Sequence, residues 1–378
     1  MHKYSVVLGI GFGDEGKGIT TDYLCHHILR QEGLAPMVVR FSGGHQAGHT
    51  VYVKESSESI IKHIFSSFGS GTLRGCPTYL SQFCTVDPIA IMNEYNVLKE
   101  QSITPTLYIN PDCPVTTPYD VFYNQNDEEN KKNGSCGRGI NSTFRREENF
   151  YSLHVSDLKY PSILNAKLEL ISSYYGFEVY PDRFLEAVKF LLECPTIILD
   201  HVEDFTIGNN YVFEGSQGLL LDQHHGFFPN VTPSNTGLTN ISKLIDINDI
   251  DIYCVIRAYQ TRHGNGFMTN NDLPNNIRTN VFETNVCNKY QGEFRRSILD
   301  LDLLKYGLER HKLNSHKLNL VVTNVDQVQN ALVFTENDKI EQFSTQEGFL
   351  LELKSRLGIE GDLLFSTSPF SEEFHNLL

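Results

Sequence analysis

Short runs of β-branched and apolar residues recur along the chain and predict buried β-strands. They lie at residues 4–8, 37–41, 106–110, 196–199, 211–213, 252–256 and 318–323. Between several of these runs, apolar residues recur at steps of three and four, which predicts helices over residues 18–30, 182–192, 297–309 and 346–357. Strands that alternate with helices indicate an α/β fold with a mostly parallel central β-sheet flanked by helices.

The chain shows no internal repeat, and its strand pattern continues from end to end without a change of composition. We therefore expect a single elaborated domain over residues 1–378. Residues 124–149 are polar and rich in asparagine and charge, and they predict a long surface excursion. A linker between two domains is the alternative for this segment, and a loop of such length is more often functional than idle.

The charge balance disfavours nucleic acid as a partner. Asp and Glu number 46 against 31 Lys and Arg, a formal net charge of -15, and such a surface repels a long phosphate backbone. A small anionic substrate remains possible, because a few basic groups in one cleft dominate the local potential.

The apolar run at the N-terminus is too short for a signal peptide, and no run approaches the length of a membrane span. We expect a cytoplasmic protein with no membrane partner.

The 8 cysteines are scattered, without C-x-x-C spacing, so we expect reduced structural thiols rather than a zinc site or a disulfide framework.

The first predicted strand runs directly into the glycine-rich segment GIGFGDEGKG at residues 9–18. A strand, a glycine loop and a helix in this order present backbone N–H groups and a positive helix end to phosphates. Gly11 to Lys17 fit the spacing G-x-x-x-x-G-K, but Gly18 stands where a P-loop has the Ser or Thr that binds Mg²⁺. Asp14 inside the loop is suited to bind the metal or take a proton. The alternative is a tight glycine turn in which Asp14 caps the helix.

A second glycine-rich segment, GGHQAGHT at residues 43–50, follows this loop. The two segments together resemble the opening signatures of the adenylosuccinate synthetase family. Further similar segments follow in the family's order: FEGSQG at 213–218, Leu221-Asp222, GFFPNVTPSN at 226–235, RAY at 257–259, TR at 261–262, RR at 295–296 and TNVD at 323–326. Because this collinear set spans nearly the whole chain, the protein is identified as a divergent, compact member of the family.

The resemblance implies a single elaborated α/β domain around a largely parallel sheet, with a P-loop-like phosphate loop. It also implies a homodimer that shares active-site residues across its interface. The expected activity is that of a ligase that forms a C–N bond in purine biosynthesis and uses Mg²⁺. In this reaction GTP phosphorylates the 6-oxygen of IMP, and the amine of aspartate displaces the phosphate to give adenylosuccinate.

The resemblance gives catalytic roles to Asp14, Lys17, His49 and Gln217. Asp14 corresponds to the base that takes the N1 proton and, with the carbonyl of Gly48, to the holder of Mg²⁺. Lys17 adds a fixed positive charge, and His49 donates to the leaving diphosphate. Gln217 contacts the nucleotide near the reacting oxygen. A structural histidine is the alternative for His49, and a turn or capping residue is the alternative for Gln217.

The expected nucleotide-substrate site includes loop residues and more distant phosphate-binding groups. Its members are Asp14, Glu15, Gly16, Lys17, Gln46, Ala47, Gly48, His49, Cys136, Arg145, Arg146, Gln217 and Thr232. Thr232 matches a hydroxyl on the 5′-phosphate, with a turn or capping role as its alternative. Cys136 replaces a phosphate-binding threonine with a weaker thiol donor. Either Arg145 or Arg146 corresponds to the arginine that crosses the dimer interface, and the sequence leaves the choice open.

The expected GTP site shares the first loop and adds residues near the C-terminus. Its members are Gly13, Asp14, Glu15, Gly16, Lys17, Gly48, His49, Thr50, Arg295, Asn324, Asp326, Ser366 and Ser368. Asp326 is suited to accept from N1–H and the 2-amino group of guanine, a donor pair that adenine lacks. Asn324 replaces the family's lysine that packs on the base. GTP is therefore expected, with ATP as the alternative.

The amino-donor loop departs most from the family pattern T-T-G-R-x-R-R. Its members here are Lys289, Tyr290, Gln291, Gly292, Glu293 and Arg295. Glu293 takes the place of an arginine that pairs with the aspartate carboxylate, and this reversal of charge costs affinity unless Lys289 or Arg295 compensates. The sequence leaves the amino donor open.

Three hypotheses therefore remain. The first is adenylosuccinate formation from IMP, aspartate and GTP. The second is a specialised paralogue that acts on another purine nucleotide such as dGMP, uses another amino donor, or uses ATP. Compact phage-type relatives that aminate deoxyguanylate typically replace the loop aspartate. The presence of Asp14 in this chain therefore favours IMP over dGMP as the substrate. The third is a catalytically idle nucleotide-binding protein, which the presence of Asp14, Lys17, His49 and Gln217 disfavours.

Overall fold

The centre of the computed structural model is a ten-stranded sheet whose neighbouring strands are parallel except for the last pair, β16 and β17. The structure describes residues 4–54, 59–132, 134–202, 210–287, 289–329 and 331–377. Across the sheet the order is β17 (His375–Asn376), β16 (Leu363–Phe365), β13 (Leu318–Thr323), β9 (Ile250–Arg257), β1 (Tyr4–Gly9), β8 (Tyr211–Gly218), β2 (Met37–Arg40), β5 (Thr78–Leu80), β6 (Leu107–Ile109) and β7 (Ile197–Leu199).

Smaller sheets flank this one. They contain the pairs β3 (His49–Lys54) with β4 (Ile60–Phe65) and β10 (Gln260–His263) with β11 (Phe294–Ser297), and the set β12 (Leu299–Asp300), β14 (Leu332–Glu336) and β15 (Lys339–Phe343). The α-helices are α1 (Lys17–Glu32), α2 (Pro88–Glu100), α3 (Pro118–Asn126), α4 (Glu128–Lys132), α5 (Ile140–Glu148), α6 (Pro161–Tyr175), α7 (Asp182–Glu193), α8 (Leu301–Arg310) and α9 (Gln346–Arg356). Short 3-10 helices occur at Thr72–Arg74, Val155–Lys159, Leu219–Leu221, Ile241–Lys243, Leu313–Ser315, Val325–Gln327 and Ser371–Glu373.

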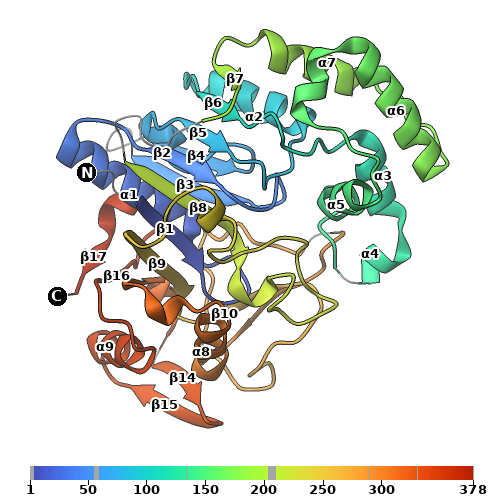
Figure 1. The fold of residues 1–378 in the computed structure, drawn as a ribbon. Helices are drawn as coiled ribbons and strands as arrows, with labels where there is room; N and C mark the ends of the chain where they lie inside the picture. The colour runs from blue at the N-terminus through green and yellow to red at the C-terminus, as the bar shows by residue number, and fades with distance from the viewer. Residues whose placement is uncertain are drawn as a thin grey trace.

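Figure 1 shows α6 and α7 at one end of the molecule and α9 with the β14–β15 hairpin at the other. Within the described ranges, a helix with the length and apolar character needed to cross a membrane does not occur.

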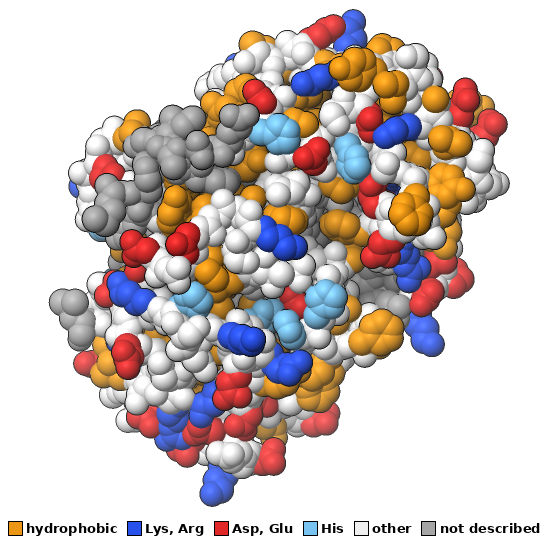
Figure 2. All heavy atoms as spheres, in the orientation of Figure 1, with side chains coloured by type: hydrophobic (Ala, Val, Ile, Leu, Met, Phe, Trp, Pro, Cys, Tyr) orange, Lys and Arg blue, Asp and Glu red, His pale blue; other side chains and the backbone are white. Residues whose placement is uncertain are grey.

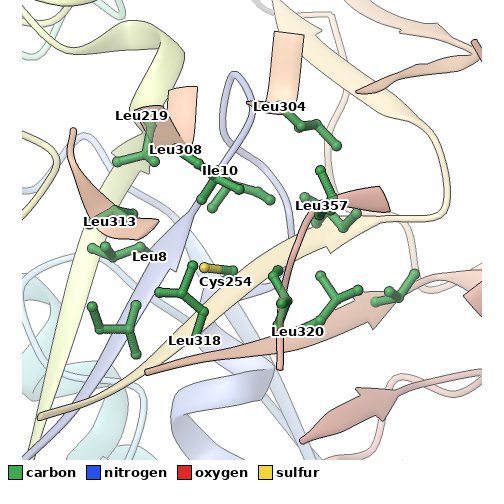
Figure 3. Close-up of a cluster of buried hydrophobic side chains, with 14 of the residues drawn as sticks. Leu8, Ile10, Leu219, Cys254, Leu304, Leu308, Leu313, Leu318, Leu320 and Leu357 are labelled. Carbon is green, nitrogen blue, oxygen red and sulfur yellow. The ribbon is translucent and has the colours of Figure 1, made fainter. Parts of the chain in front are cut away.

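Alternating side chains of the central strands fill two cores, one on each face of the sheet. Leu8 and Cys254 face α8 and α9 and pack with leucines of both helices (Figure 3). Val7 and Val255 point to the opposite face and pack with Leu24 and other residues of α1. A strand that is buried on both faces requires a nearly continuous apolar run, which explains why these strands are visible in the sequence. A third core joins β5, β6 and β7 to α2, α6 and α7.

The predicted strands and the mostly parallel α/β architecture are confirmed, but the helix predicted over residues 297–309 begins late. Ser297 ends β11, where it pairs with Gln260, and Leu299–Asp300 form β12 beside β14. Asp300 then caps α8, because its carboxylate accepts the N–H groups of Asp302 and Leu303 at 2.9 and 3.3 Å. Pairing with β10 and β14 therefore places residues at the start of this segment in strands, although the apolar periodicity predicted a helix there.

Residues 124–149, predicted as a surface excursion, hold the end of α3, the short helix α4 and α5. Parts of this segment are exposed, but α5 packs inward and buries Ile140, Ser142, Thr143 and Arg146. The segment is thus helical and partly integrated into the fold rather than a single irregular loop.

Candidate active site

A cavity of about 480 Å³ lies at the carboxyl ends of the central strands. Its walls include the loop after β1, Gln217 near the end of β8, Arg257 at the end of β9 and Thr323 at the end of β13. The carboxyl ends of parallel strands are the usual place for a ligand in an open α/β sheet, because the loops there diverge from a fixed base.

The glycine loop between β1 and α1 is held in place by side chains that bind its carbonyl groups. Thr261 donates to the carbonyl of Gly13 at 2.7 Å, Arg257 to that of Asp14 at 2.5 Å and Thr323 to that of Glu15 at 2.8 Å. A Cβ at position 16 would lie 2.7 Å from a methyl group of Thr323, so only glycine fits this close contact, and its φ is 96°. These contacts fix the shape of a loop that faces the cavity.

Two charged residues of the loop pair inside it. Nζ of Lys17 lies 3.4 Å from a carboxylate oxygen of Glu15, and both side chains are buried. Burial raises the pKa of Glu15, although the ammonium group of Lys17 acts in the opposite direction. Lys17 is also the first residue of α1, so its charge and the helix N-terminus lie together at the wall of the cavity.

The structure explains why glycine occupies position 18, where a P-loop has Ser or Thr. A Cβ at Gly18 would lie 2.8 Å from the Cβ of His49, at the start of β3. The strand therefore passes too close to α1 for any side chain at position 18. This close approach is what brings His49 beside the phosphate loop.

His49 forms a buried pair with Glu214. Nδ1 of His49 lies 2.7 Å from Oε1 of Glu214; Oε1 also accepts from the hydroxyl of Ser70, and Oε2 accepts from the N–H of Ser70 at 3.2 Å. Burial alone would raise the pKa of Glu214, but His49, Arg40 and these hydrogen bonds together lower it to about 2. Burial lowers the pKa of His49 and so favours its neutral form. The anionic Glu214 thus holds the Nδ1 proton of His49 and orients Nε2 for another partner.

Several lining residues have buried polar atoms without a hydrogen-bond partner in the described part of the chain. They are Nε2 of His49, Oε1 of Gln46, Oε1 of Gln217 and Nδ1 of His263. Native proteins seldom leave such atoms unpaired, because each loses its hydrogen bonds to water on burial. Their concentration in one cavity indicates a polar ligand with several donors and acceptors.

Asp14 presents its carboxylate to the cavity from a left-handed backbone conformation, with φ 58° and 28% of its side chain exposed. Nε2 of His263 is 3.6 Å from one of its oxygens. The N-terminus of α1 begins at Lys17, beyond Gly16, and no side-chain hydrogen bond caps it. Asp14 therefore does not cap α1, and the alternative of a capping residue is wrong.

Residues of the loop 280–286 also line the cavity. Asn280 donates to Oδ2 of Asp326 at 3.0 Å, and the hydroxyls of Thr284 and Thr50 are 2.9 Å apart. Glu283 forms an ion pair with Arg257, and burial raises the pKa of Asp326. The loop thus occupies one hydrogen-bonding position on the carboxylate that was expected to contact guanine.

Most of the expected nucleotide and GTP residues line this one cavity. Those that do are Gly13, Asp14, Glu15, Gly16, Lys17, Gln46, Ala47, Gly48, His49, Thr50, Gln217, Asn324, Asp326, Ser366 and Ser368, with Gln291 from the amino-donor loop. Segments that are more than 300 positions apart in the chain, such as 13–18 and 366–369, thereby meet.

Other expected residues lie away from the cavity walls. Cys136, Thr232, Lys289, Tyr290, Gly292 and Glu293 are absent from its lining. Tyr290 packs on Gly137, so the amino-donor loop contacts the segment that contains Cys136. Burial raises the pKa of the Cys136 thiol.

Arg146 requires a correction because its guanidinium group is buried within the fold, and Arg295 is hydrogen-bonded to two backbone carbonyls. Arg295 donates to the carbonyls of Gly264 and Gly266 at 2.9 Å each and is not among the residues that line the cavity, so its expected places in the GTP site and the amino-donor loop stay predictions. Arg146 is fully buried against Asp120 and is inaccessible to a nucleotide or a partner subunit. The neighbouring Arg145 is exposed.

Sequence reasoning did not assign Glu214, Arg257, His263, Glu283 and Arg138 to the site. Glu214 and Arg257 stand within segments that carried the family resemblance, which was the available signal. His263 directly follows the TR segment in β10. The loop around Glu283 has no motif, and only the fold places it against Arg257.

Comparison with known proteins supports the resemblance. The sequence profile described as adenylosuccinate synthetase matches residues 6–355. The chain is 32% identical over 289 residues to adenylosuccinate synthetase 1 of Pseudoalteromonas translucida, covering 70% of this chain and 63% of that protein. It is 30% identical over 354 residues to adenylosuccinate synthetase of Borrelia duttonii, covering 87% and 78%. The match thus spans less than two thirds of several curated relatives.

Two solved structures share the fold. Fully ligated adenylosuccinate synthetase from Plasmodium falciparum has a TM-score of 0.78 at 17% identity and covers 99% of each chain. The succinoaminodeoxyadenylate synthetase of cyanophage S-2L has a TM-score of 0.63 at 14% identity, covering 100% of this chain and 95% of that one. The fold, the order of the motifs and the sequence matches agree: the chain belongs to the adenylosuccinate synthetase family.

Proposed function

We propose that this protein is a Mg²⁺-dependent ligase that phosphorylates the 6-oxygen of IMP with GTP and replaces it with the amine of aspartate, giving adenylosuccinate. The observation that supports this most strongly is the set of unpaired buried polar atoms of His49, Gln46 and Gln217 in the cavity that also contains Asp14. A purine base and phosphates supply the donors and acceptors that such atoms need. The names of the curated relatives support the same activity.

Each reacting group of the purine has a suited residue. The partly exposed carboxylate of Asp14 takes the proton from N1, which moves electron density onto the 6-oxygen. Nε2 of His49 lines the cavity, and it donates to the leaving diphosphate once the imidazole has taken a second proton, a form that the anionic Glu214 at Nδ1 stabilises. Lys17 at the N-terminus of α1 adds positive charge for the transferred phosphoryl group. Gln217 contacts the base through its amide.

The loop residues also fit a magnesium ion. Asp14 and Gly48 both line the cavity, and a carboxylate and a backbone carbonyl are hard oxygen donors of the kind that Mg²⁺ prefers, together with substrate phosphates and water. When bound there, Mg²⁺ would neutralise charge on the phosphates. The residues themselves supply the proton transfer and the positioning.

The test of this proposal combines two triphosphates and two substrates. Purified protein is incubated with Mg²⁺, GTP or ATP, and IMP or dGMP, with and without aspartate, while product mass and phosphate release are followed. We expect adenylosuccinate from IMP, aspartate and GTP. Phosphate release without an aspartate adduct would contradict aspartate as the amino donor, and no reaction in any combination would overturn the proposal in favour of an idle nucleotide-binding protein.

A second candidate function is a paralogue that uses ATP or a deoxynucleotide. The observation that favours it is the hydrogen bond from Asn280 to Asp326, because this bond competes with guanine for the carboxylate. The cyanophage protein of the same fold is described as bound to dGMP and dATP, its energy donor. The retained Asp14 favours the first function.

Replacing Asn280 with Ala should tighten GTP and leave ATP unchanged. The substitution frees an oxygen of Asp326. Because water reaches this exposed hydrogen bond, its net contribution is about 0.5–1.5 kcal/mol, so we expect the KM for GTP to fall by about 2- to 10-fold. The KM for ATP is the internal control, since adenine lacks the paired donors. Equal changes for both triphosphates, or none for GTP, would show that Asp326 does not bind guanine.

The amino donor is proposed to be aspartate, bound with the help of Arg138. Arg138 is exposed and lines the cavity, whereas the lining cations Lys17 and Arg257 pair with Glu15 and Glu283. Arg138 could therefore meet an incoming carboxylate in place of the arginine that Glu293 replaces. A KM for aspartate that is unchanged in Arg138→Met would refute this role.

We also propose a homodimer in which exposed Arg145 reaches the partner's site. Sedimentation of the purified protein at the mass of a single chain would contradict it.

A further inference from the structure

A cluster of two histidines and one aspartate lies outside the active-site cavity. One ligating atom each from Asp222, His225 and His311 lies within 4.8 Å of the others, and none of the three residues lines the cavity. Asp222 and His225 belong to the loop after the 3-10 helix Leu219–Leu221, whereas His311 follows the last residue of α8. Figure 2 shows histidine side chains gathered on the face that carries α8 and β10.

The carboxylate of Asp222 is fixed before any ligand arrives. It is buried, its Oδ1 accepts the N–H groups of His224 and His225 at 2.9 and 3.2 Å, and its Oδ2 accepts the N–H of Thr236 at 2.8 Å. The hydroxyl of Thr236 is 3.5 Å from Oδ2, a long hydrogen bond that a cation at this oxygen would replace. Such outer hydrogen bonds are what orient a metal-binding carboxylate.

Nδ1 of His225 has no hydrogen bond among the described residues, and the carboxylate of Asp222 lies beside it at ion-pair distance. The atom is buried, and Oδ1 of Asp222 is only 3.4 Å away. If the ring is neutral with its proton on Nε2, two lone pairs face each other across this gap. A cation between the nitrogen and the carboxylate removes that repulsion and satisfies both atoms.

His311 is oriented as a metal-binding imidazole often is. Its Nε2 lies 3.2 Å from the carbonyl of Leu219, an acceptor that fixes the ring and leaves Nδ1 with its lone pair. The rings of His225 and His311 lie 4.7 Å apart at an angle of 71°.

We propose that Asp222, His225 and His311 bind a zinc-class divalent ion, with water completing a tetrahedral set. Two imidazole nitrogens and one carboxylate oxygen suit Zn²⁺ or Co²⁺, whereas Mg²⁺ prefers oxygen ligands alone. The ion would join the loop that contains Thr232 to the end of α8. This site is independent of the Mg²⁺ expected at Asp14, and its existence does not depend on the proposed reaction.

The experiment uses the full chain, freed of metal with a chelator and titrated with Co²⁺, whose visible absorption is strong in a tetrahedral site. We expect saturation at one equivalent and displacement by Zn²⁺. His225→Ala and His311→Ala should each weaken binding by about 100-fold or more, since loss of even an outer-shell partner costs about 10–100-fold. His224→Ala is the matched control, because His224 is the exposed neighbour of His225 and lies outside the cluster.

Circular dichroism of the metal-free variants separates loss of a ligand from loss of the fold. A wild-type chain without the tetrahedral absorption overturns the proposal and leaves an ordinary ion pair of His225 with Asp222. Binding that survives in both His225→Ala and His311→Ala, or that is lost equally in His224→Ala, also overturns it.

Discussion

Replacement of Asp14 by Asn is expected to lower kcat of the ligase reaction by about 10²- to 10⁴-fold, the range contributed by a positioned general base. An amide has nearly the shape of the carboxylate but cannot accept the N1 proton or balance the charge of Mg²⁺. The backbone at Asp14 has φ 58°, a conformation that Asn adopts as readily as Asp, so the loop should keep its form. The carbonyl that accepts from Arg257 is also unchanged.

Asp338→Asn is the matched control for this substitution. Asp338 has φ 60° and lies in the turn between β14 and β15, far from the cavity lining. Phosphate release with IMP, GTP and aspartate measures kcat, and thermal unfolding verifies that both variants fold. If Asp14→Asn kept wild-type kcat, Asp14 would be a structural residue of the loop and the proposed proton transfer would be wrong.

Replacement of Arg146 by Met should lower the free energy of unfolding by about 3–5 kcal/mol, the usual cost of breaking a buried ion pair. Nε of Arg146 lies 3.0 Å from Asp120, both side chains are fully buried, and the guanidinium also donates to the carbonyl of Val115 at 2.8 Å. Methionine fills much of the space but leaves the carboxylate of Asp120 in the interior without its cation. Since Asp120 also closes the capping box of α3, the loss should spread to the α3–α5 contact.

Arg145→Met is the control that shows whether loss of the buried ion pair, rather than loss of a positive charge, lowers the free energy of unfolding. It removes the same charge at the adjacent, exposed position. A surface substitution of this kind usually changes stability by about 0.5 kcal/mol or less. Urea denaturation followed by circular dichroism measures both variants against the wild type. Equal destabilisation by the two substitutions would mean that Arg146 does not stabilise α5 through its pair with Asp120.

Arg145 and Arg146 also mark a limit of prediction from the sequence. The two residues are identical in type and adjacent, so the resemblance could not choose between them. The choice follows from the orientation of α5, which turns position 146 toward Asp120 and position 145 toward solvent. Helix orientation depends on what the helix packs against, and that information is spread over the whole chain.

The amino-donor loop and the triphosphate site show the same limit. The sequence indicated that Glu293 changes the donor site, but it could not show that Arg295 donates to the carbonyls of Gly264 and Gly266. It predicted that Asp326 contacts guanine, but it could not show that Asn280 donates to this carboxylate. Contacts between distant loops have no local signal, because they form only after the sheet has placed the loops.

The sequence by itself determined the buried strands of the central sheet, the helix after the glycine loop and the family. Strands buried on both faces must be continuously apolar, and a backbone that approaches phosphate needs glycines at fixed spacing. Both features therefore require particular residues at neighbouring positions, which can be recognised in the sequence. The tertiary structure alone decided that His49 pairs with Glu214, that Arg146 is buried, and that His225 meets His311. These pairs join residues of different elements, and their geometry follows from how the sheet, α5 and α8 pack, which no local pattern encodes.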